Sequence, residues 1–275
     1  MEKRLKQLLT TVYDSPLSAF YRNHFKKHNF SPVQFQTLSD IEKIPILNWK
    51  LLSTTPLLER IYTKEPYLTK IIYKNDRSFL VGRTLADIAL EDYGLSCTRP
   101  LMLFSTSHEG VEKGLWFFEH NILPAINEEN LELTAMIAAK YEIDGIVAEM
   151  ELLKQFLPRL QKNGYNFSRI SNIKIIDTSF DISFLKTHFP SKNFKIILGL
   201  PETGAFAKAC PKSFDHEIIV FHPNEMSILE FNETILVTRL LTLPTPIIRY
   251  QTNIFAEIQK QYICTCEKVV SSFSS

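Results

Sequence analysis

The sequence predicts a mixed α/β fold, in which a mainly parallel sheet flanked by helices is followed by a small β-rich subdomain. Between residues 100 and 198, apolar runs of strand length alternate with helical segments, which is typical of parallel strands joined by helical crossovers. After Cys210, short strand-like segments follow one another closely, as they do in antiparallel sheets. These two observations together predict the fold class.

The N-terminal part of the chain is predicted to be helical up to a first hairpin. Leu5, Leu8, Leu9 and Val12 recur at helical spacing and would form one buried face. Pro16 then interrupts the helical pattern before it resumes. The expected elements are helices at residues 2–13 and 17–28, a short helix at 39–43 and a hairpin within 68–81.

Strands and helices are expected to alternate through the middle of the chain. The predicted strands lie at residues 100–105, 143–148, 173–176 and 194–198. The predicted helices lie at residues 84–93, 111–120, 131–141, 151–163 and 184–188. Short strands follow at residues 217–221, 226–231, 234–240 and 255–262. We therefore expect an α/β core with a helical N-terminal region at residues 1–209, and a β-rich subdomain of the same domain at residues 210–275.

The composition excludes several classes of partner. The chain has 275 residues, with 31 Lys and Arg against 30 Asp and Glu, so its charge does not predict a nucleic-acid or anionic-membrane partner. No apolar run has the length of a membrane span. Four cysteines in a chain of this length do not form a disulfide framework, so we expect a reducing, cytoplasmic location.

Two segments carry the most specific motifs. Residues 194–204 form an apolar strand that runs into a polar turn, and residues 234–254 form a strand, a Pro-containing loop and another strand. Together they resemble the adenylate-forming ligases, and specifically the phenylacetate–CoA ligase branch. That family has Tyr-Gly-Leu-Thr-Glu in the first segment and Arg-Tyr-Arg-Thr-Gly-Asp in the second. The resemblance extends from Ser15 to Cys266 and implies the family's N-terminal core.

The resemblance implies a set of nucleotide- or ligand-binding candidates. Within the family, the first motif contacts adenine, phosphate and magnesium, and the second contacts the ribose. Two of the candidates also have a structural interpretation, since Glu202 could cap a turn and Arg249 could pair with a carboxylate. The matching positions are Gly199, Glu202, Thr203, Arg249, Tyr250 and Thr252.

Several chemical groups of the family are replaced. Leu198 stands where an aromatic ring stacks on adenine, and Pro201 stands where a Thr contacts phosphate. Ile254 stands where an Asp accepts both ribose hydroxyls, and it offers no acceptor. The family's phosphate loop is rich in Gly, whereas residues 72–78 have none. With only 8 Gly in the chain, few loops can wrap closely around a phosphate, which argues against ATP chemistry.

Other polar positions give weaker signals. Residues 177–179 replace the family's acceptor-side Gly-Gly-Glu motif. His108 and Glu109 follow an apolar run and form a candidate acid–base pair, although solvated loop residues are the simpler interpretation. The chain ends at Ser275, where the hinge to the family's C-terminal lid would begin, so we expect the lid domain to be absent.

The cysteines and histidines of the C-terminal part suggest a metal site. Two thiolates, a third Cys and one imidazole would satisfy a tetrahedral structural zinc, and some family members carry Cys and His at similar places. Ordinary buried cysteines are the alternative, which we favour for Cys97. The candidate ligands are Cys210, His216, His222, Cys264 and Cys266.

Two classes of function remain open. The first is a degenerate ligase-like protein that keeps the fold as a weakly ligand-binding or scaffolding module, with a protein partner. The second is a diverged carboxylate-activating synthetase or CoA ligase, which would use ATP and magnesium on a small-molecule carboxylate with a lid supplied in trans. The loss of the phosphate loop, ribose Asp and aromatic residue favours the first class. A homodimer is left open in both cases.

Overall fold

The computed structural model describes most of the chain. The described residues are 1–60, 62, 68–74, 77–83, 99–103, 123–125, 130–177, 180–189, 193–200, 203–214, 219–240, 245–255, 257–263 and 269–274.

The largest sheet has seven strands in the order β4-β3-β5-β6-β7-β8-β9. The five strands from β4 to β7 pair in parallel, and β8 and β9 extend this sheet with antiparallel pairs. The strands are β3 (Pro100–Leu103), β4 (Leu123–Ala125), β5 (Gly145–Ala148), β6 (Asn172–Ile176), β7 (Asn193–Leu200), β8 (Gly204–Ala209) and β9 (Phe221–Pro223). All four residues of β5 are buried, because a parallel strand inside such a sheet is covered on both faces.

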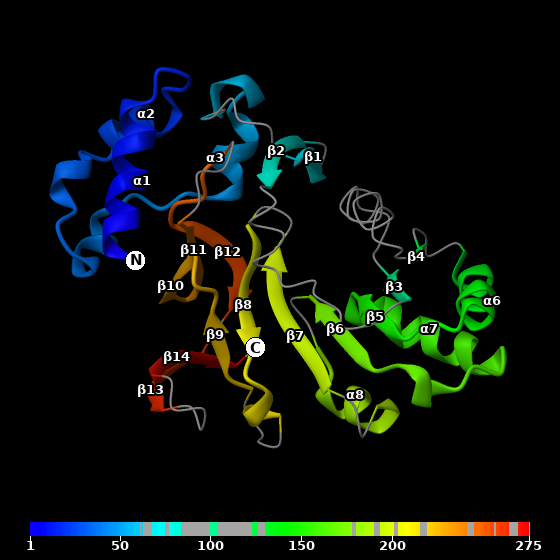
Figure 1. The fold of residues 1–275 in the computed structure, drawn as a ribbon. Coiled ribbons are helices and arrows are strands. Elements are labelled where there is room, and N and C mark those ends of the chain that lie inside the picture. The colour runs from blue at the N-terminus through cyan, green and yellow to red at the C-terminus, as the bar shows by residue number, and fades with distance from the viewer. Residues whose placement is uncertain are drawn as a thin grey trace.

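Three helices lie beside the parallel strands (Figure 1): α6 (Leu131–Tyr141), α7 (Met150–Lys162) and α8 (Ile182–His188). α7 and α8 are the crossovers that connect β5 to β6 and β6 to β7. α7 buries Leu153, Phe156 and Leu160 in the same core as the parallel strands. Gly164 follows this helix with a φ of 71°, a left-handed conformation that glycine adopts without steric cost.

The N-terminal region forms a second core. Its helices are α1 (Glu2–Asp14), α2 (Phe20–Lys27) and α3 (Trp49–Thr54), with 3-10 helices at Pro32–Gln34, Leu38–Lys43 and Leu57–Arg60. Leu5, Leu9 and Phe25 pack there with Ile248 and Tyr250 from the C-terminal part of the chain. Leu47 forms an isolated parallel bridge with Tyr250, so the N-terminal region is attached directly to the strand that carries the second motif.

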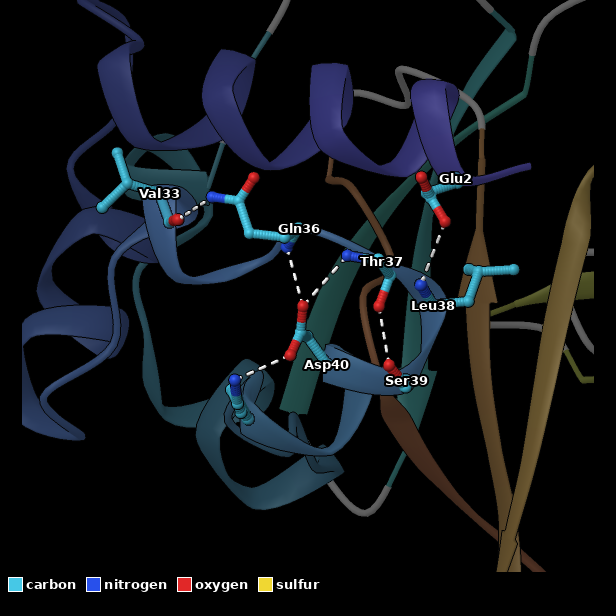
Figure 2. A network of polar contacts seen from close by, with 8 residues as sticks. Glu2, Val33, Gln36, Thr37, Leu38, Ser39 and Asp40 are labelled. Carbon is cyan, nitrogen blue, oxygen red and sulfur yellow. Dashed lines mark hydrogen bonds and ion pairs between the residues drawn. The ribbon is translucent and has the colours of Figure 1, made fainter.

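Asp40 organises the 3-10 helix at Leu38–Lys43 (Figure 2). Its carboxylate accepts the backbone N–H groups of Gln36 and Thr37 at 2.8 and 2.9 Å, and Lys43 Nζ lies 2.6 Å from its other oxygen. The hydrogen bond to Lys43, followed by those to the two backbone groups, holds the pKa of Asp40 well below its usual range. An acidic group is favoured at this end of a helix, where free N–H groups converge.

Short antiparallel sheets complete the fold. A three-stranded sheet has the order β10-β11-β12, and it lies beside β8 and β9 in Figure 1. Two further sheets are hairpins, and β14 of the second packs beside β9. The strands are β10 (Ser227–Asn232), β11 (Thr234–Arg239) and β12 (Tyr250–Phe255), then β1 (Leu68–Lys74) with β2 (Arg77–Arg83), and β13 (Glu257–Ile263) with β14 (Val269–Ser274). 3-10 helices also occur at Phe167–Arg169 and Pro211–Ser213.

The predicted fold class is confirmed, with a mainly parallel sheet, flanking helices and a small antiparallel sheet. Several features differ from the sequence-based expectation, which did not include α3, β4 or β14. β8 was not predicted, and β9 belongs to the large sheet although it follows residue 210. The helices predicted at residues 84–93 and 111–120 lie outside the described residues. Within the described part of the chain, no helix has the length and apolar character needed to cross a membrane.

Candidate functional site

The first motif forms the connection between β7 and β8. Gly199 pairs with Ala205 across this hairpin, and a Cβ at residue 199 would lie 3.0 Å from both Ala205 Cα and Gly204 O. Gly204 has a φ of 66°, which places it in the left-handed region. These two positions therefore require glycine for different reasons, the first for close backbone approach and the second for its conformation. Pro201 and Glu202 lie outside the described residues.

Thr203 belongs to the structure of this hairpin. It is buried, and its hydroxyl donates a hydrogen bond to Gly204 O at 3.0 Å. The buried Arg239 of β11 donates from Nη1 to Thr203 O at 2.9 Å and also to Ala205 O. A charged guanidinium forms stronger hydrogen bonds than a neutral donor does. Arg239 therefore fixes the turn of the first motif to the small sheet.

The second motif begins at Arg249, whose backbone has a φ of 47°. Its backbone N–H donates to Thr238 Oγ1 at 2.9 Å. Its Nε lies 3.0 Å from both carboxylate oxygens of Glu230, and Nη2 lies 2.8 Å from one of them. Nη1 donates to the carbonyl groups of Glu42, at 2.9 Å, and Ile44. The guanidinium thus connects β10, β12 and the N-terminal region.

The ion pair between Arg249 and Glu230 is largely buried. Burial raises the pKa of Glu230, and the hydrogen bond and charge of Arg249 oppose this shift without cancelling it. The nearby charge of Glu42 adds to the rise. The Arg249 side chain thus pairs with a defined carboxylate, that of Glu230.

Side chains alternate between the two faces of β12. Tyr250, Thr252 and Ile254 are buried, whereas Gln251 and Asn253 are exposed. The Thr252 hydroxyl donates to Ile235 O at 2.8 Å and accepts the N–H of Ile254 at 3.2 Å. Tyr250 packs in the N-terminal core, and Ile254 packs in the main core. The buried face of β12 is thus occupied by internal packing.

Leu198 precedes Gly199 in β7 and also belongs to the first motif. It has no exposed surface and belongs to the main core with Phe206 and Ile235. Its side chain therefore contributes to packing at the position where the family has an aromatic residue.

The predicted zinc ligands are only partly described. Cys210 is a buried thiol, and its backbone N–H donates to Val220 O at 2.7 Å. His222 on β9 pairs in register with Lys208. Among the described residues, no group of three or more His, Cys, Asp and Glu side chains is placed to hold a metal ion. His216, Cys264 and Cys266 lie outside the described residues, as do the candidate pair His108 and Glu109.

Sequence reasoning missed the two residues that organise these motifs. Glu230 and Arg239 are charged residues inside strands that are otherwise mostly apolar or small. A charge at such a position is costly unless it is paired, and this is the signal that could have identified them. Asp177 also has a structural contact, since its carboxylate accepts the backbone N–H of Met150 at 2.9 Å.

The solved structures to which this chain is similar include a CoA ligase and an amide bond synthetase. It is similar to a structure of 2-hydroxyisobutyryl-CoA ligase with 2-HIB-AMP in the postadenylation state, with a TM-score of 0.72 and 11% identity over 99% of this chain and 65% of the ligase. The same ligase with 2-HIB-AMP and CoA in the thioesterification state gives a TM-score of 0.75 at 11% identity and the same coverage. The amide bond synthetase McbA from Marinactinospora thermotolerans gives 0.52 at 10% identity over 75% of this chain and 48% of McbA.

These comparisons establish the fold and leave the activity open. The chain spans about two thirds of the ligase, and identity this low does not carry function from one protein to another. No protein-family model matches the sequence, and no curated protein matches it.

Proposed function

We propose that this chain is a degenerate adenylate-forming ligase-like protein of the phenylacetate–CoA ligase type, which acts as a weakly ligand-binding or scaffolding module without adenylating a carboxylate. The observation that carries this proposal is Ile254. It occupies the position of the family's ribose-binding Asp, and its side chain is buried in the main core. A methylene surface cannot accept the hydrogen bonds of two ribose hydroxyls.

Three further observations support the same conclusion. Leu198 is buried in place of the aromatic residue, so no ring is available there to stack on adenine. The Thr203 and Thr252 hydroxyls both donate to backbone carbonyl groups of the protein. The Arg249 guanidinium donates to the Glu230 carboxylate and to the carbonyl groups of Glu42 and Ile44, all within the protein. The retained motif residues thus maintain the fold of the site.

The magnitudes favour weak nucleotide binding. Each buried polar contact that is lost removes about 1–3 kcal/mol. A micromolar nucleotide complex has only about 8 kcal/mol of binding free energy. Loss of the ribose acceptor and the adenine stack, together with the Gly-free segment at residues 72–78, would therefore leave ATP binding in the millimolar range or weaker.

The alternative is a diverged carboxylate–CoA ligase or acyl-adenylate synthetase. The similar structures include a ligase in complex with 2-HIB-AMP and CoA, and Gly199, Thr203 and Thr252 stand at positions that resemble the two motifs. In this case ATP and magnesium would be the cofactors, a small carboxylate would be the substrate, and a lid supplied in trans would complete the site.

One experiment distinguishes the two functions. ATP and AMP, each with magnesium, are titrated calorimetrically into the protein, and pyrophosphate release is measured with 2-hydroxyisobutyrate, phenylacetate and benzoate, with and without CoA. 2-Hydroxyisobutyryl-CoA ligase in the same assays is the positive control. We expect no saturable ATP binding below about 1 mM and no carboxylate-stimulated pyrophosphate release. Pyrophosphate release that depends on one carboxylate would establish the ligase instead.

Two finer proposals accompany this function. A structural zinc held by Cys210, Cys264, Cys266 and either His216 or His222 would connect the C-terminal hairpin to the large sheet. A cytoplasmic location is proposed because the buried thiol of Cys210 fits a reducing compartment. A protein partner or a second copy of this chain would be the natural ligand of a scaffolding module.

A further inference from the structure

A cavity of about 500 Å³ lies in the N-terminal region, between α2 and α3. Its apolar surface comes from Phe20, Ile46 and Leu51. Leu47 points into the core beside Tyr250, whereas its neighbours Ile46 and Asn48 line the cavity. The volume is within the range of small-molecule sites, and the cavity is formed by residues other than those of the two motifs.

His24 contributes a buried polar atom to this cavity. The residue is only 7% exposed, and its Nε2 makes no hydrogen bond of good geometry within the described part of the chain, although the carbonyl groups of Pro45 and Ile46 lie near the ring. The His24 ring stacks against Phe20 with 6.4 Å between centroids and meets His28 edge-on at 4.7 Å. Leaving such a polar atom unsatisfied costs about 1–3 kcal/mol, so it is a natural contact for a ligand.

The charge around the cavity is mostly positive. Lys27 of α2 and Lys50 of α3 line it, together with the single carboxylate of Glu59. Neither lysine forms an ion pair with another described residue. His28 Nδ1 donates to His24 O at 2.9 Å, because a carbonyl group can only accept. A cavity with an apolar floor and two ammonium groups that no described carboxylate neutralises suits an anion that has an apolar body.

We propose that the cavity between α2 and α3 is a binding site for a small organic carboxylate. Its anionic group lies against the ammonium groups of Lys27 and Lys50, and its apolar body lies against Phe20 and Ile46. The side-chain amide of Asn48 contributes a further donor, because its oxygen already accepts the N–H of Leu51 at 2.9 Å. This site is separate from the proposed function, and it requires neither nucleotide binding nor adenylation.

A bound carboxylate would also change the pKa of His24. Burial lowers the pKa of this imidazole to about 4, with His28 adding to the effect and the Pro45 and Ile46 carbonyl groups opposing it. A negative charge in the cavity favours the protonated ring, so the pKa of His24 rises when the anion binds. This response distinguishes binding beside His24 from binding elsewhere on the protein.

The test uses the full chain at pH 7 with benzoate, isobutyrate and inorganic phosphate as anionic probes. Benzamide has the same shape as benzoate without its charge and is the matched neutral probe. Affinities are measured by calorimetry, and the His24 ring is followed by NMR as the pH is lowered. We expect saturable binding of benzoate or isobutyrate, benzoate at least about fivefold tighter than benzamide, and an upward shift of the His24 pKa with the carboxylate bound.

Variants of the two lysines test whether the ligand binds in the cavity. Lys27→Met and Lys50→Met should each weaken carboxylate binding about fivefold, and the double variant should weaken it more. Lys26→Met is the matched control, because Lys26 is an exposed neighbour on α2 that does not line the cavity. Equal weakening by Lys26→Met, equal affinity for benzamide, tighter binding of phosphate than of any carboxylate, or no saturable binding would each overturn the proposal.

Discussion

Arg249 is bound to Glu230 through two of its nitrogen atoms, with Nε 3.0 Å from both carboxylate oxygens and Nη2 2.8 Å from one. The same guanidinium donates to carbonyl groups of Glu42 and Ile44, about 200 residues earlier in the chain. The Arg249 side chain thus connects the N-terminal region to the small sheet.

The first prediction concerns the stability that this ion pair contributes. Arg249→Met should lower the free energy of unfolding by about 3–5 kcal/mol, because it leaves the Glu230 carboxylate buried without its partner. Denaturant unfolding measures the effect. The double variant Arg249→Met/Glu230→Leu should lose less than the single variant, because both charges are then removed.

A surface ion pair provides the control for this prediction. Arg99 lies 3.8 Å from Glu142, and both side chains are about half exposed. Arg99→Met should change the free energy of unfolding by less than about 1 kcal/mol. If Arg99→Met and Arg249→Met destabilise the protein equally, Arg249 does not have the structural role described here.

The second prediction concerns the close approach at Gly199. Gly199→Ala should destabilise the protein by about 1–3 kcal/mol, because the new Cβ would lie 3.0 Å from backbone atoms of the β7–β8 hairpin. Gly164 has open space around it and a φ of 71°, so Gly164→Ala should cost about 1 kcal/mol for conformational reasons alone. Asn tolerates that conformation, so it should be better than Ala at Gly164 and worse than Ala at Gly199. The same order of Ala and Asn at both positions would contradict the steric explanation.

The sequence predicted the elements whose signals are local. Leu5, Leu8, Leu9 and Val12 were expected on one helical face, and all four are buried in α1. β8 was missed because Gly204–Ala209 consists mostly of small residues and has no strand pattern of its own. Its strand conformation depends on pairing with β7 and β9, which is information that the local sequence does not contain.

The candidate site was less predictable than the fold. The resemblance identified Arg249, but its partners Glu230, Glu42 and Ile44 come from elements that are distant in sequence. The cavity between α2 and α3 was not predicted, although two histidines four residues apart in a predicted helix face the same side. The partners of Arg249 and the cavity both depend on tertiary packing, which the periodicity of the sequence does not reveal.

The third prediction concerns acid stability. The pKa of His24 falls from 6.5 to about 4 on folding, so the unfolded chain binds a proton first as the pH decreases. His24 should therefore reduce stability progressively between pH 6.5 and pH 4, by at most about 3 kcal/mol, and have no effect above pH 7. His28 and Lys27 on α2 also disfavour its protonation, while Lys50 on α3 and the carboxylate of Glu59 face the same cavity among the described lining residues.

Unfolding of His24→Leu over this pH range measures the contribution of His24. The variant should retain more of its stability at pH 4.5, relative to pH 7.5, than the original protein does. His188→Leu is the control, because His188 is exposed on α8. Identical pH profiles for the original protein and His24→Leu would show that His24 is not the group that titrates.

The last prediction concerns zinc. Cys210 and His222 lie on neighbouring chain segments of the large sheet, where Cys210 N–H donates to Val220 O and His222 pairs with Lys208. β14 packs beside β9, which carries His222. If Cys264 and Cys266 join this pair, protein purified without an affinity metal should contain about one zinc per chain, and chelation should lower its melting temperature because metal binding contributes to folding. Cys264→Ser and Cys266→Ser should each remove the zinc, whereas Cys97→Ser should leave the zinc content unchanged. Zinc below about 0.1 per chain, with melting unaffected by chelation, would mean that these cysteines bind no metal and that the C-terminal hairpin is held by packing alone.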